Sequence, residues 1–256
     1  MSIHPTAIVD LKAELGTDVV VGPYCVIGPD VRIGDGCWLQ HHVTVCGPTN
    51  IGQRNRFHSY GSIGQQTQDL KYAGEPTYLE IGDGNCFREF VTVHRATAAG
   101  NVTIVRNNGN FLSYAHIAHD CDVGNNVIFS NNGTLGGHVL VGEFAVLGGL
   151  SAVHQFCRIG KHAITGGCSK IVQDVPPYMI ADGNPAEIRG INLIGLERRG
   201  FPPETIRILK EAFRILYRAK LNTKQATEEI RRSLPEIQEL KELIHFIETS
   251  QRGIIR

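Results

Sequence analysis

The stretch IAHDCDVGNNVIFSNNGTLGGHVLVG, residues 117–142, repeats a simple pattern every six residues. An apolar residue recurs at each sixth position, glycine follows several of these residues, and a small or β-branched residue comes four positions after each. A period of six fits neither an α-helix, with about 3.6 residues per turn, nor an isolated strand, in which side chains alternate. It is typical of a hexapeptide repeat, in which each hexad supplies a short strand and a turn to a parallel β-helix.

The same pattern extends in both directions. Stepping by sixes from Ile3 to Ile63 meets an apolar residue every time, and stepping from Val105 to Ile171 meets one exception, Thr165. Three hexads would make one triangular coil of about 18 residues, with the apolar residues stacked in a continuous buried column. We expect the glycine that follows each apolar position to allow a positive φ in the turn.

Two polar segments leave the pattern, residues 65–77 and 96–102, and we interpret both as loops that leave the coil. Surface loops on a rigid scaffold are where functional residues gather. From about Pro202 the apolar spacing becomes helical. The sequence therefore predicts a mainly β protein, with a parallel β-helix over residues 1–189 and a small α-helical domain over 190–256 that covers the open end of the coil.

The composition narrows the setting. Lys+Arg and Asp+Glu both number 25, so no net charge favours nucleic acid as a partner. No apolar run is long enough for an integral membrane segment, and the first residues do not resemble a signal peptide. Seven scattered cysteines do not suggest a disulfide framework. We expect a cytoplasmic protein, with four cysteines in small inward positions: Cys25, Cys37, Cys121 and Cys157.

Stacking of the coils predicts a site. Residues 18 apart occupy equivalent places on neighbouring coils, about 4.8 Å from each other. His119 therefore lies one coil from Gly137 and two coils from Gln155. Because His138 and His154 adjoin these positions, three histidines converge on one edge. His116 occupies a different point of the coil, beside Thr134.

Three interpretations of His119 and Asp120 follow. A metal site is the weakest, because an HxxH pair shares one face on a helix but not on this coil. An inert role, with polar atoms satisfied by the backbone, suits histidines such as His41, His42 and His162 better than His119. The third is a neutral imidazole held by a carboxylate, which can take a proton from an alcohol, with a glycine N–H nearby as an oxyanion donor.

At this point the residues match more than a fold. The chain resembles the UDP-N-acetylglucosamine O-acyltransferase family, whose members catalyse the first step of lipid A synthesis in Gram-negative bacteria. The resemblance covers nearly the whole length, implies the left hand of the β-helix, and rests on QDLKYAGEPT at 68–77, HR at 94–95, AHIAHDC at 115–121, GGHV at 136–139, VHQF at 153–156, QDVPPY at 173–178 and GLERRGF at 195–201.

The resemblance implies transfer of an (R)-3-hydroxyacyl chain from acyl carrier protein to the 3-hydroxyl of UDP-N-acetylglucosamine. His119 would be the general base, Asp120 would orient it, and the Gly137 N–H would hold the oxyanion. The donor would arrive on the phosphopantetheine of acyl carrier protein, so no further cofactor and no metal are expected.

The same resemblance implies the binding residues and the assembly. The substrate-binding set would be Gln68, Asp69, Lys71, His94, His116, His138, His154, Gln155, Arg198 and Arg199. Family members form homotrimers with active sites between subunits. Gly167 falls where the family limits the acyl chain, and glycine there leaves room for a longer chain.

Alternatives remain open at this stage. An N-acyltransferase of the same pathway shares the coil and a histidine base, but carries an additional N-terminal domain. A metal-dependent hydratase of the gamma carbonic anhydrase type also shares the coil. A solenoid without catalytic activity is the third. The acceptor could also be the 3-amino analogue of the sugar, which differs by one atom.

Overall fold

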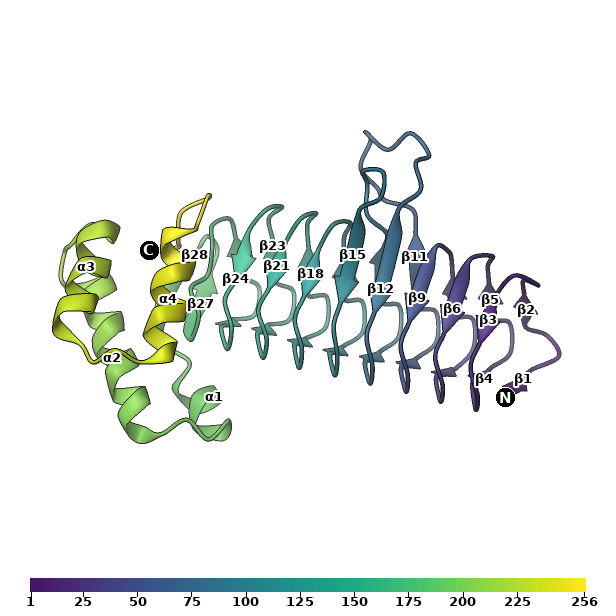
Figure 1. Cartoon of the computed structure of the whole chain (residues 1–256), viewed down its shortest axis with the longest axis horizontal. Coiled ribbons are helices and arrows are strands. Elements are labelled where there is room, and N and C mark those ends of the chain that lie inside the picture. The colour runs from purple at the N-terminus through teal and green to yellow at the C-terminus, as the bar shows by residue number, and fades with distance from the viewer.

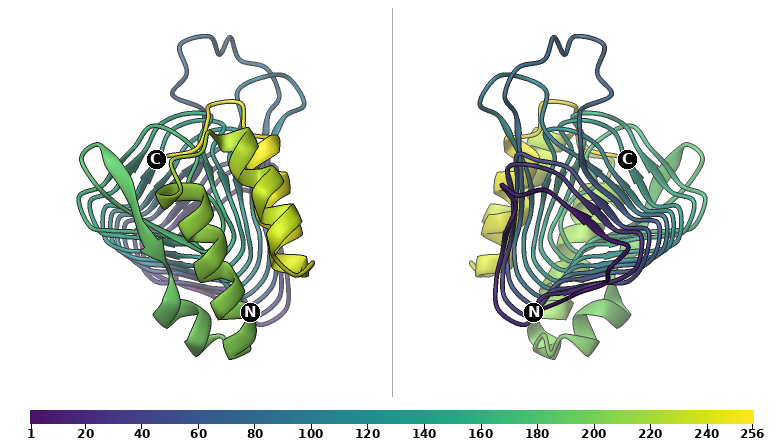
Figure 2. Two further views of the ribbon diagram at one scale, coloured as in Figure 1. Left: turned by 90° about the vertical axis from the view of Figure 1, so that its left-hand side faces the viewer. Right: turned by 90° about the vertical axis from the view of Figure 1, so that its right-hand side faces the viewer.

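The computed structural model describes all 256 residues. The chain winds into a left-handed parallel β-helix that is followed by four helices (Figure 1). Viewed along its axis the coil is triangular, and each side is one sheet (Figure 2). Successive strands fall in turn on the three sheets, which we call A, B and C, so the fold predicted from the six-residue pattern is confirmed.

The strands are short and hydrogen-bond to the equivalent strand of the next coil. Sheet A contains β1 (Ser2–Ile3), β4 (Val20–Val21), β7 (Trp38–Leu39), β10 (Arg56–Phe57), β13 (Cys86–Phe87), β16 (Asn110–Phe111), β19 (Ile128–Phe129), β22 (Val146–Leu147), β25 (Ile164–Thr165), β27 (Met179–Gly183) and β28 (Ala186–Ile191). Sheet B contains β2 (Ile8–Val9), β5 (Val26–Ile27), β8 (Thr44–Val45), β11 (Ser62–Gln65), β14 (Thr92–His94), β17 (His116–Ile117), β20 (Thr134–Leu135), β23 (Ala152–Val153) and β26 (Lys170–Ile171). Sheet C contains β3 (Glu14–Leu15), β6 (Val31–Ile33), β9 (Thr49–Ile51), β12 (Tyr78–Ile81), β15 (Val102–Val105), β18 (Asp122–Val123), β21 (Leu140–Val141) and β24 (Arg158–Ile159).

The register explains how the two loops fit. His116 pairs with Thr134, as the spacing of 18 predicts. Ser62 instead pairs with Thr92, and Thr92 with His116, because each of these coils carries extra residues. The chain leaves the coil between β11 and β12 and again between β14 and β15, and both loops rise from the same corner of the triangle (Figures 1 and 2). We call residues 66–77 the first excursion and residues 95–101 the second.

The repeating apolar positions form the core. From Val21 onward these inward side chains are almost wholly buried. Thr165, the exception in the pattern, is also buried, and its hydroxyl satisfies itself by accepting from the Gly148 N–H and donating to Ser151. The four cysteines predicted to point inward, Cys25, Cys37, Cys121 and Cys157, are buried.

The prediction about glycine was wrong in its reason. The residue with positive φ is the third after most inward positions, such as Asp120 or His138; of the glycines that come directly after an inward residue, Gly64 alone has a positive φ, of 72°. Most of these glycines are instead required by the next coil. A Cβ on Gly22 would lie 1.3 Å from the Gln40 carbonyl oxygen, and one on Gly136 would lie 2.8 Å from the Gln155 nitrogen. Close approach of neighbouring backbones therefore selects glycine there.

The C-terminal end of the coil is closed by pairing and by helices. β27 and β28 form an antiparallel hairpin that extends sheet A, and Ile254 near the C-terminus forms a bridge with Asp174. The helices are α1 (Leu193–Arg198), α2 (Pro203–Arg218), α3 (Thr223–Ser233) and α4 (Gln238–Glu248). None of the four is both long and apolar enough to cross a membrane.

Candidate active site

The corner between sheets B and C, called the BC corner, holds most of the predicted site. It is formed by the turns at residues 118–121, 136–139 and 154–157 on successive coils, and both excursions leave the coil at this corner. The sequence brings these turns together because each follows a sheet B strand by the same number of residues. The corner thus places His119, Gly137 and Gln155 on three adjacent coils, as predicted.

His119 and Asp120 form a hydrogen-bonded pair. His119 Nδ1 lies 2.8 Å from Asp120 Oδ2, and the two side chains are only 12% and 5% exposed. Asp120 occupies the corner position of its turn, with a positive φ of 58°. A carboxylate at Nδ1 fixes the imidazole so that Nε2 is free to accept a proton.

Neighbouring groups keep the Asp120 carboxyl ionised. Burial alone would raise the pKa of Asp120, but hydrogen bonds from His119, Asn101 and the Thr97 N–H, together with the nearby His138 imidazole, lower it below the usual value. Thr97 donates to Oδ2 and Asn101 to Oδ1, each over 3.0 Å. The carboxylate is therefore charged at neutral pH and held from several sides.

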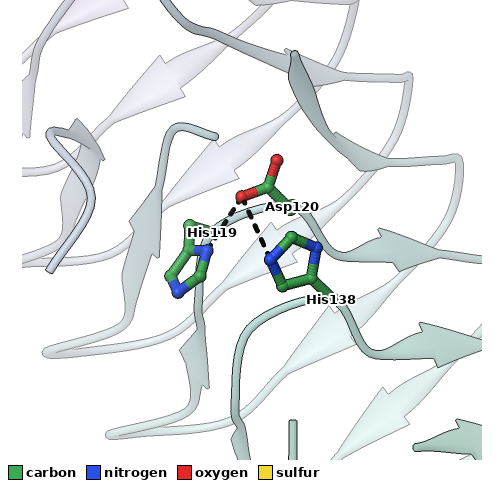
Figure 3. Close-up of side chains that lie close together, drawn as sticks. All are labelled: His119, Asp120 and His138. Carbon is green, nitrogen blue, oxygen red and sulfur yellow. Dashed lines mark hydrogen bonds and ion pairs between the residues drawn. The ribbon is translucent and has the colours of Figure 1, made fainter. Parts of the chain in front are cut away.

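His138 completes a group of three possible metal ligands (Figure 3). Its Nε2 lies 3.8 Å from Asp120 Oδ2, and the ligand atoms of His119, Asp120 and His138 all lie within 4.8 Å of one another. His138 also stacks on Phe156, with ring centroids 4.6 Å apart. His116, the other histidine of the HxxH pair, is not part of this group, whereas His119 and His138 converge as the spacing of 18 predicts.

Gly137 lies directly against the His119 ring. A Cβ added to Gly137 would stand 2.3 Å from His119 Cε1 and 2.5 Å from Nε2. The Gly137 N–H has no hydrogen-bond partner in the chain, whereas its carbonyl accepts from the Phe156 N–H. A free donor next to a free Nε2 is the arrangement required for an oxyanion site beside a base.

An open cleft of about 810 Å³ runs along this corner. Eight residues of the predicted site line it: Gln68, Asp69, Lys71, His116, His119, Gly137, His154 and Gln155. The first excursion thus lies beside the His119 turn of the same chain. Asp69 Oδ1 accepts from the Lys71 N–H, and the Asp69 N–H donates to Thr67 Oγ1, which fixes the carboxylate at the cleft wall.

His94 and His116 occupy sheet B next to this cleft. Burial, reinforced by the neighbouring His116 and His119, lowers the pKa of His94 to about 4. Burial followed by His119 also lowers the pKa of His116, whose Nδ1 lies 2.7 Å from Thr92 Oγ1. His94 lines an adjoining pocket that shares Gln68 and Asp69 with the cleft. These imidazoles are therefore neutral groups that can exchange hydrogen bonds with a polar ligand.

Three residues of the predicted site, Arg198, Arg199 and Gly167, lie away from the BC corner. Arg199 stacks over Phe144, 4.1 Å from the ring centroid, at the corner between sheets C and A, called the CA corner. Arg198 ends α1 on this side, and Figure 2 shows α1 far from the excursions. Gly167 belongs to the third corner, between sheets A and B, called the AB corner.

Sequence reasoning missed the residues that hold Asp120. Thr97 and Asn101 belong to the second excursion, and Thr103 Oγ1 accepts from the Asp120 N–H over 2.8 Å. Only the position of Asp120 one coil from residue 102, where the second excursion ends, could have suggested them, because a segment outside the repeat has no predictable register.

Comparisons with known proteins agree with this geometry. Residues 174–255 match the family model described as Udp N-acetylglucosamine O-acyltransferase, Domain 2, and residues 12–47 match the bacterial transferase hexapeptide model. The acyl-[acyl-carrier-protein]–UDP-N-acetylglucosamine O-acyltransferase of Thermodesulfovibrio yellowstonii is 51% identical over 255 residues, 99% of each chain.

Solved structures are equally similar. LpxA from Acinetobacter baumannii superimposes with a TM-score of 0.97 at 44% identity, and each chain is covered completely. The UDP-N-acetylglucosamine acyltransferase LpxA of Bacteroides fragilis gives a TM-score of 0.98 at 37% identity, over 99% of this chain and 100% of the other. With the hexapeptide coil and the His–Asp cleft in place, full-length identity of this size shows that the chain belongs to the UDP-N-acetylglucosamine O-acyltransferase family.

Proposed function

We propose that this acyltransferase moves an (R)-3-hydroxyacyl group from acyl carrier protein to the 3-hydroxyl of UDP-N-acetylglucosamine, the first step of lipid A biosynthesis. One observation carries the proposal: a His–Asp pair, a glycine N–H without a partner and a polar loop meet on one open cleft in a chain of this family. The acyl group arrives as a thioester on the phosphopantetheine of acyl carrier protein, so no other cofactor takes part.

His119 supplies the base. Its Nε2 accepts the proton of the sugar hydroxyl as that oxygen attacks the thioester carbonyl carbon, and the imidazolium is stabilised by Asp120 at Nδ1. The tetrahedral intermediate then expels the thiolate, which takes the same proton from Nε2. The ester and the free thiol are formed, and His119 is neutral again.

Gly137 supplies the oxyanion donor. The carbonyl oxygen gains negative charge in the tetrahedral intermediate, and the Gly137 N–H, which has no competing partner, can donate to it. Because Gly137 lies against the His119 ring, donor and base can act on the same reacting group.

The cleft wall binds the sugar nucleotide. The Asp69 carboxylate suits sugar hydroxyls, and Gln68, His154 and Gln155 offer further polar groups. Lys71 adds a positive charge towards the diphosphate. His116 lines the same cleft, His94 lines the adjoining pocket, and the His138 ring lies 5.2 Å from that of His119, centroid to centroid.

We also propose a homotrimer, because the residues suited to phosphate lie at another corner. His119 stands at the BC corner, at the far edge of sheet B from the AB corner. The Arg198–Arg199 pair stands at the CA corner, at the far edge of sheet A from the AB corner. If three AB corners meet at a threefold axis, sheet B of one subunit faces sheet A of the next. The arginines of one subunit then approach His119 of its neighbour.

The AB corner has the surface that such an axis requires. Exposed rings follow it in a continuous stack from Tyr24 through His42, Tyr60 and Phe90 to Tyr114, with centroids 4.8 to 5.1 Å apart. A contiguous exposed apolar stripe of this kind marks a protein contact.

Mixing two inactive variants tests the shared cleft. We expect His119→Ala and Arg198→Ala/Arg199→Ala homotrimers to be inactive at low substrate concentration. When the subunits of the two variants are mixed at random, the mixture should show about one quarter of wild-type activity. Each mixed trimer then has one cleft in which both His119 of one subunit and the arginines of its neighbour are intact. Activity is measured after co-refolding, with separately refolded parents as the control. Parental levels in the mixture would mean that the arginines do not act on a neighbouring cleft.

Gly167 lies where a chain bound between subunits would end. It belongs to the AB corner, at the side of sheet B opposite His119, and a Cβ there would meet nothing closer than the Gly149 carbonyl at 3.5 Å. The absent side chain leaves room for a longer acyl group in the groove.

A metal-dependent hydratase is the competing function, since His119, Asp120 and His138 could hold an ion. The Asp120 carboxylate oxygens, however, already accept from Thr97, Asn101 and His119, so this cluster is complete as a base with its orienting acid. We place the activity in the cytoplasm, where seven free thiols such as those of this chain remain reduced.

One assay tests the reaction and the metal together. We expect acyl transfer in the presence of EDTA. The donors are 3-hydroxyacyl carrier proteins of increasing chain length, and the transfer rate to UDP-N-acetylglucosamine is compared with the rate to its 3-amino analogue. Because the proposed chemistry needs no ion, EDTA should not change the rate. The absence of transfer to both acceptors, or restoration only by Zn²⁺, would overturn the proposal.

A further inference from the structure

We infer that the second excursion is a positioning element, and that Thr67 and Thr97 connect the substrate loop to the catalytic acid by hydrogen bonds. The inference rests on the proposed function, because it assigns a role to residues that act through Asp120 and Asp69. Neither threonine touches the reacting atoms.

The contacts of Asp120 show what the excursion does there. Its Oδ2 accepts from the Thr97 N–H, its Oδ1 from the Asn101 side chain, and its own N–H donates to Thr103 Oγ1. These bonds fix both the backbone and the carboxylate plane, and Oδ2, which also accepts from Thr97, meets His119 Nδ1. A residue at a corner with positive φ would otherwise be held only by its neighbours in the stack, as His138 is held by Phe156.

A second set of contacts continues to the first excursion. Thr97 Oγ1 lies 2.8 Å from Thr67 Oγ1, and Thr67 Oγ1 also accepts from the Asp69 N–H over 3.0 Å. Thr67 is 4% exposed, so its hydroxyl has no access to water as an alternative partner. The contacts therefore link the Asp69 N–H through the two threonine hydroxyls to Thr97, whose own backbone N–H donates to Asp120.

These contacts join two walls of one cleft. Asp69 and His119 both line it, yet they belong to segments that the coil alone would leave independent. Hydrogen bonds to a common buried element keep the distance between a sugar-binding group and a base within the narrow range that catalysis requires. The second excursion, which follows β14, thus keeps the sugar-binding group and the base at a fixed distance.

The first variant removes the link. Thr67→Val keeps the side-chain shape but loses the hydroxyl, and we expect kcat/KM to fall about tenfold, the equivalent of one hydrogen bond, with kcat and KM for the sugar nucleotide both affected. Thr67→Ser keeps the hydroxyl and should restore activity. The matched control is Thr77→Val at the other end of the same loop, because the buried Thr77 hydroxyl has no partner.

The second variant separates positioning from folding. Asn101→Asp removes the donor to Asp120 Oδ1 and places a second carboxyl about 3 Å from it. Two carboxylates this close repel, so the pKa of the pair rises and Asp120 loses its charge at a higher pH than in the wild type. Because His119 needs the ionised carboxylate, the acidic limb of the pH profile of kcat/KM should move to higher pH. The other titratable groups that face this pair are His94, His116, His138, His154, Asp69 and Lys71, and all remain in place. A purely structural role would lower the melting temperature without moving that limb.

The outcomes are distinguishable. If Thr67→Val matches Thr77→Val in activity and Asn101→Asp leaves the pH profile unchanged, the inference is overturned while the proposed function stands. If His119→Ala remains active, the base assignment itself fails, whatever the excursion variants show.

Discussion

Replacing His119 by alanine is expected to abolish acyl transfer while the coil stays folded. Loss of a general base costs about 10² to 10⁴ in rate, and this variant also removes the partner of Asp120. The turn itself does not depend on the imidazole, because the His119 carbonyl accepts from the His138 N–H and the inward residues on both sides are unchanged. Steady-state kcat/KM is the measurement, with circular dichroism and mass in solution reported beside it.

His245→Ala is the matched control. His245 lies on the exposed face of α4, and alanine favours the helix, so wild-type activity is expected. Retention of more than a few per cent of activity by His119→Ala would remove His119 from its role. Loss of activity together with loss of the circular dichroism signal would show only that the variant fails to fold.

The repeat explains why much of the site was predictable from sequence. Inward residues at a fixed period determine the coil, and the coil determines which positions 18 apart lie side by side. His119, Gly137 and Gln155 therefore lie on adjacent coils as predicted, and His116 pairs with Thr134. The calculation succeeds because no residue is inserted between these turns.

Prediction stopped where the repeat stops. Thr97 and Asn101 reach Asp120 from a loop whose path follows from no period, and their hydrogen bonds could only be found in three dimensions. The β27–β28 hairpin is antiparallel, a pairing that a hexapeptide pattern does not contain. The prediction that these glycines are needed for a positive φ failed for a related reason. Glycine is selected there by a clash with the next coil, and the sequence pattern alone does not distinguish this cause from a requirement for positive φ.

Gly137→Ala is expected to reduce kcat/KM by at least about 100-fold, because small displacements of a catalytic group are costly. The added methyl carbon would lie 2.3 to 3.0 Å from three atoms of the His119 ring. The ring cannot move away freely, since Asp120 holds Nδ1 and His138 stands 5.2 Å from it, centroid to centroid. The φ of Gly137 lies outside the left-handed region, so alanine suffers no backbone strain of its own.

A double-mutant cycle shows whether this contact is the cause. Overpacking should destabilise Gly137→Ala by about 1–3 kcal/mol in a wild-type background, measured by chemical denaturation. In a His119→Ala background the ring is gone, and the same methyl group should cost nearly nothing, so the two changes couple strongly. Equal destabilisation in both backgrounds would place the clash elsewhere in the coil. Because the methyl group lies next to both the base and the N–H of the oxyanion donor, activity lost without any loss of stability would instead indicate that donor.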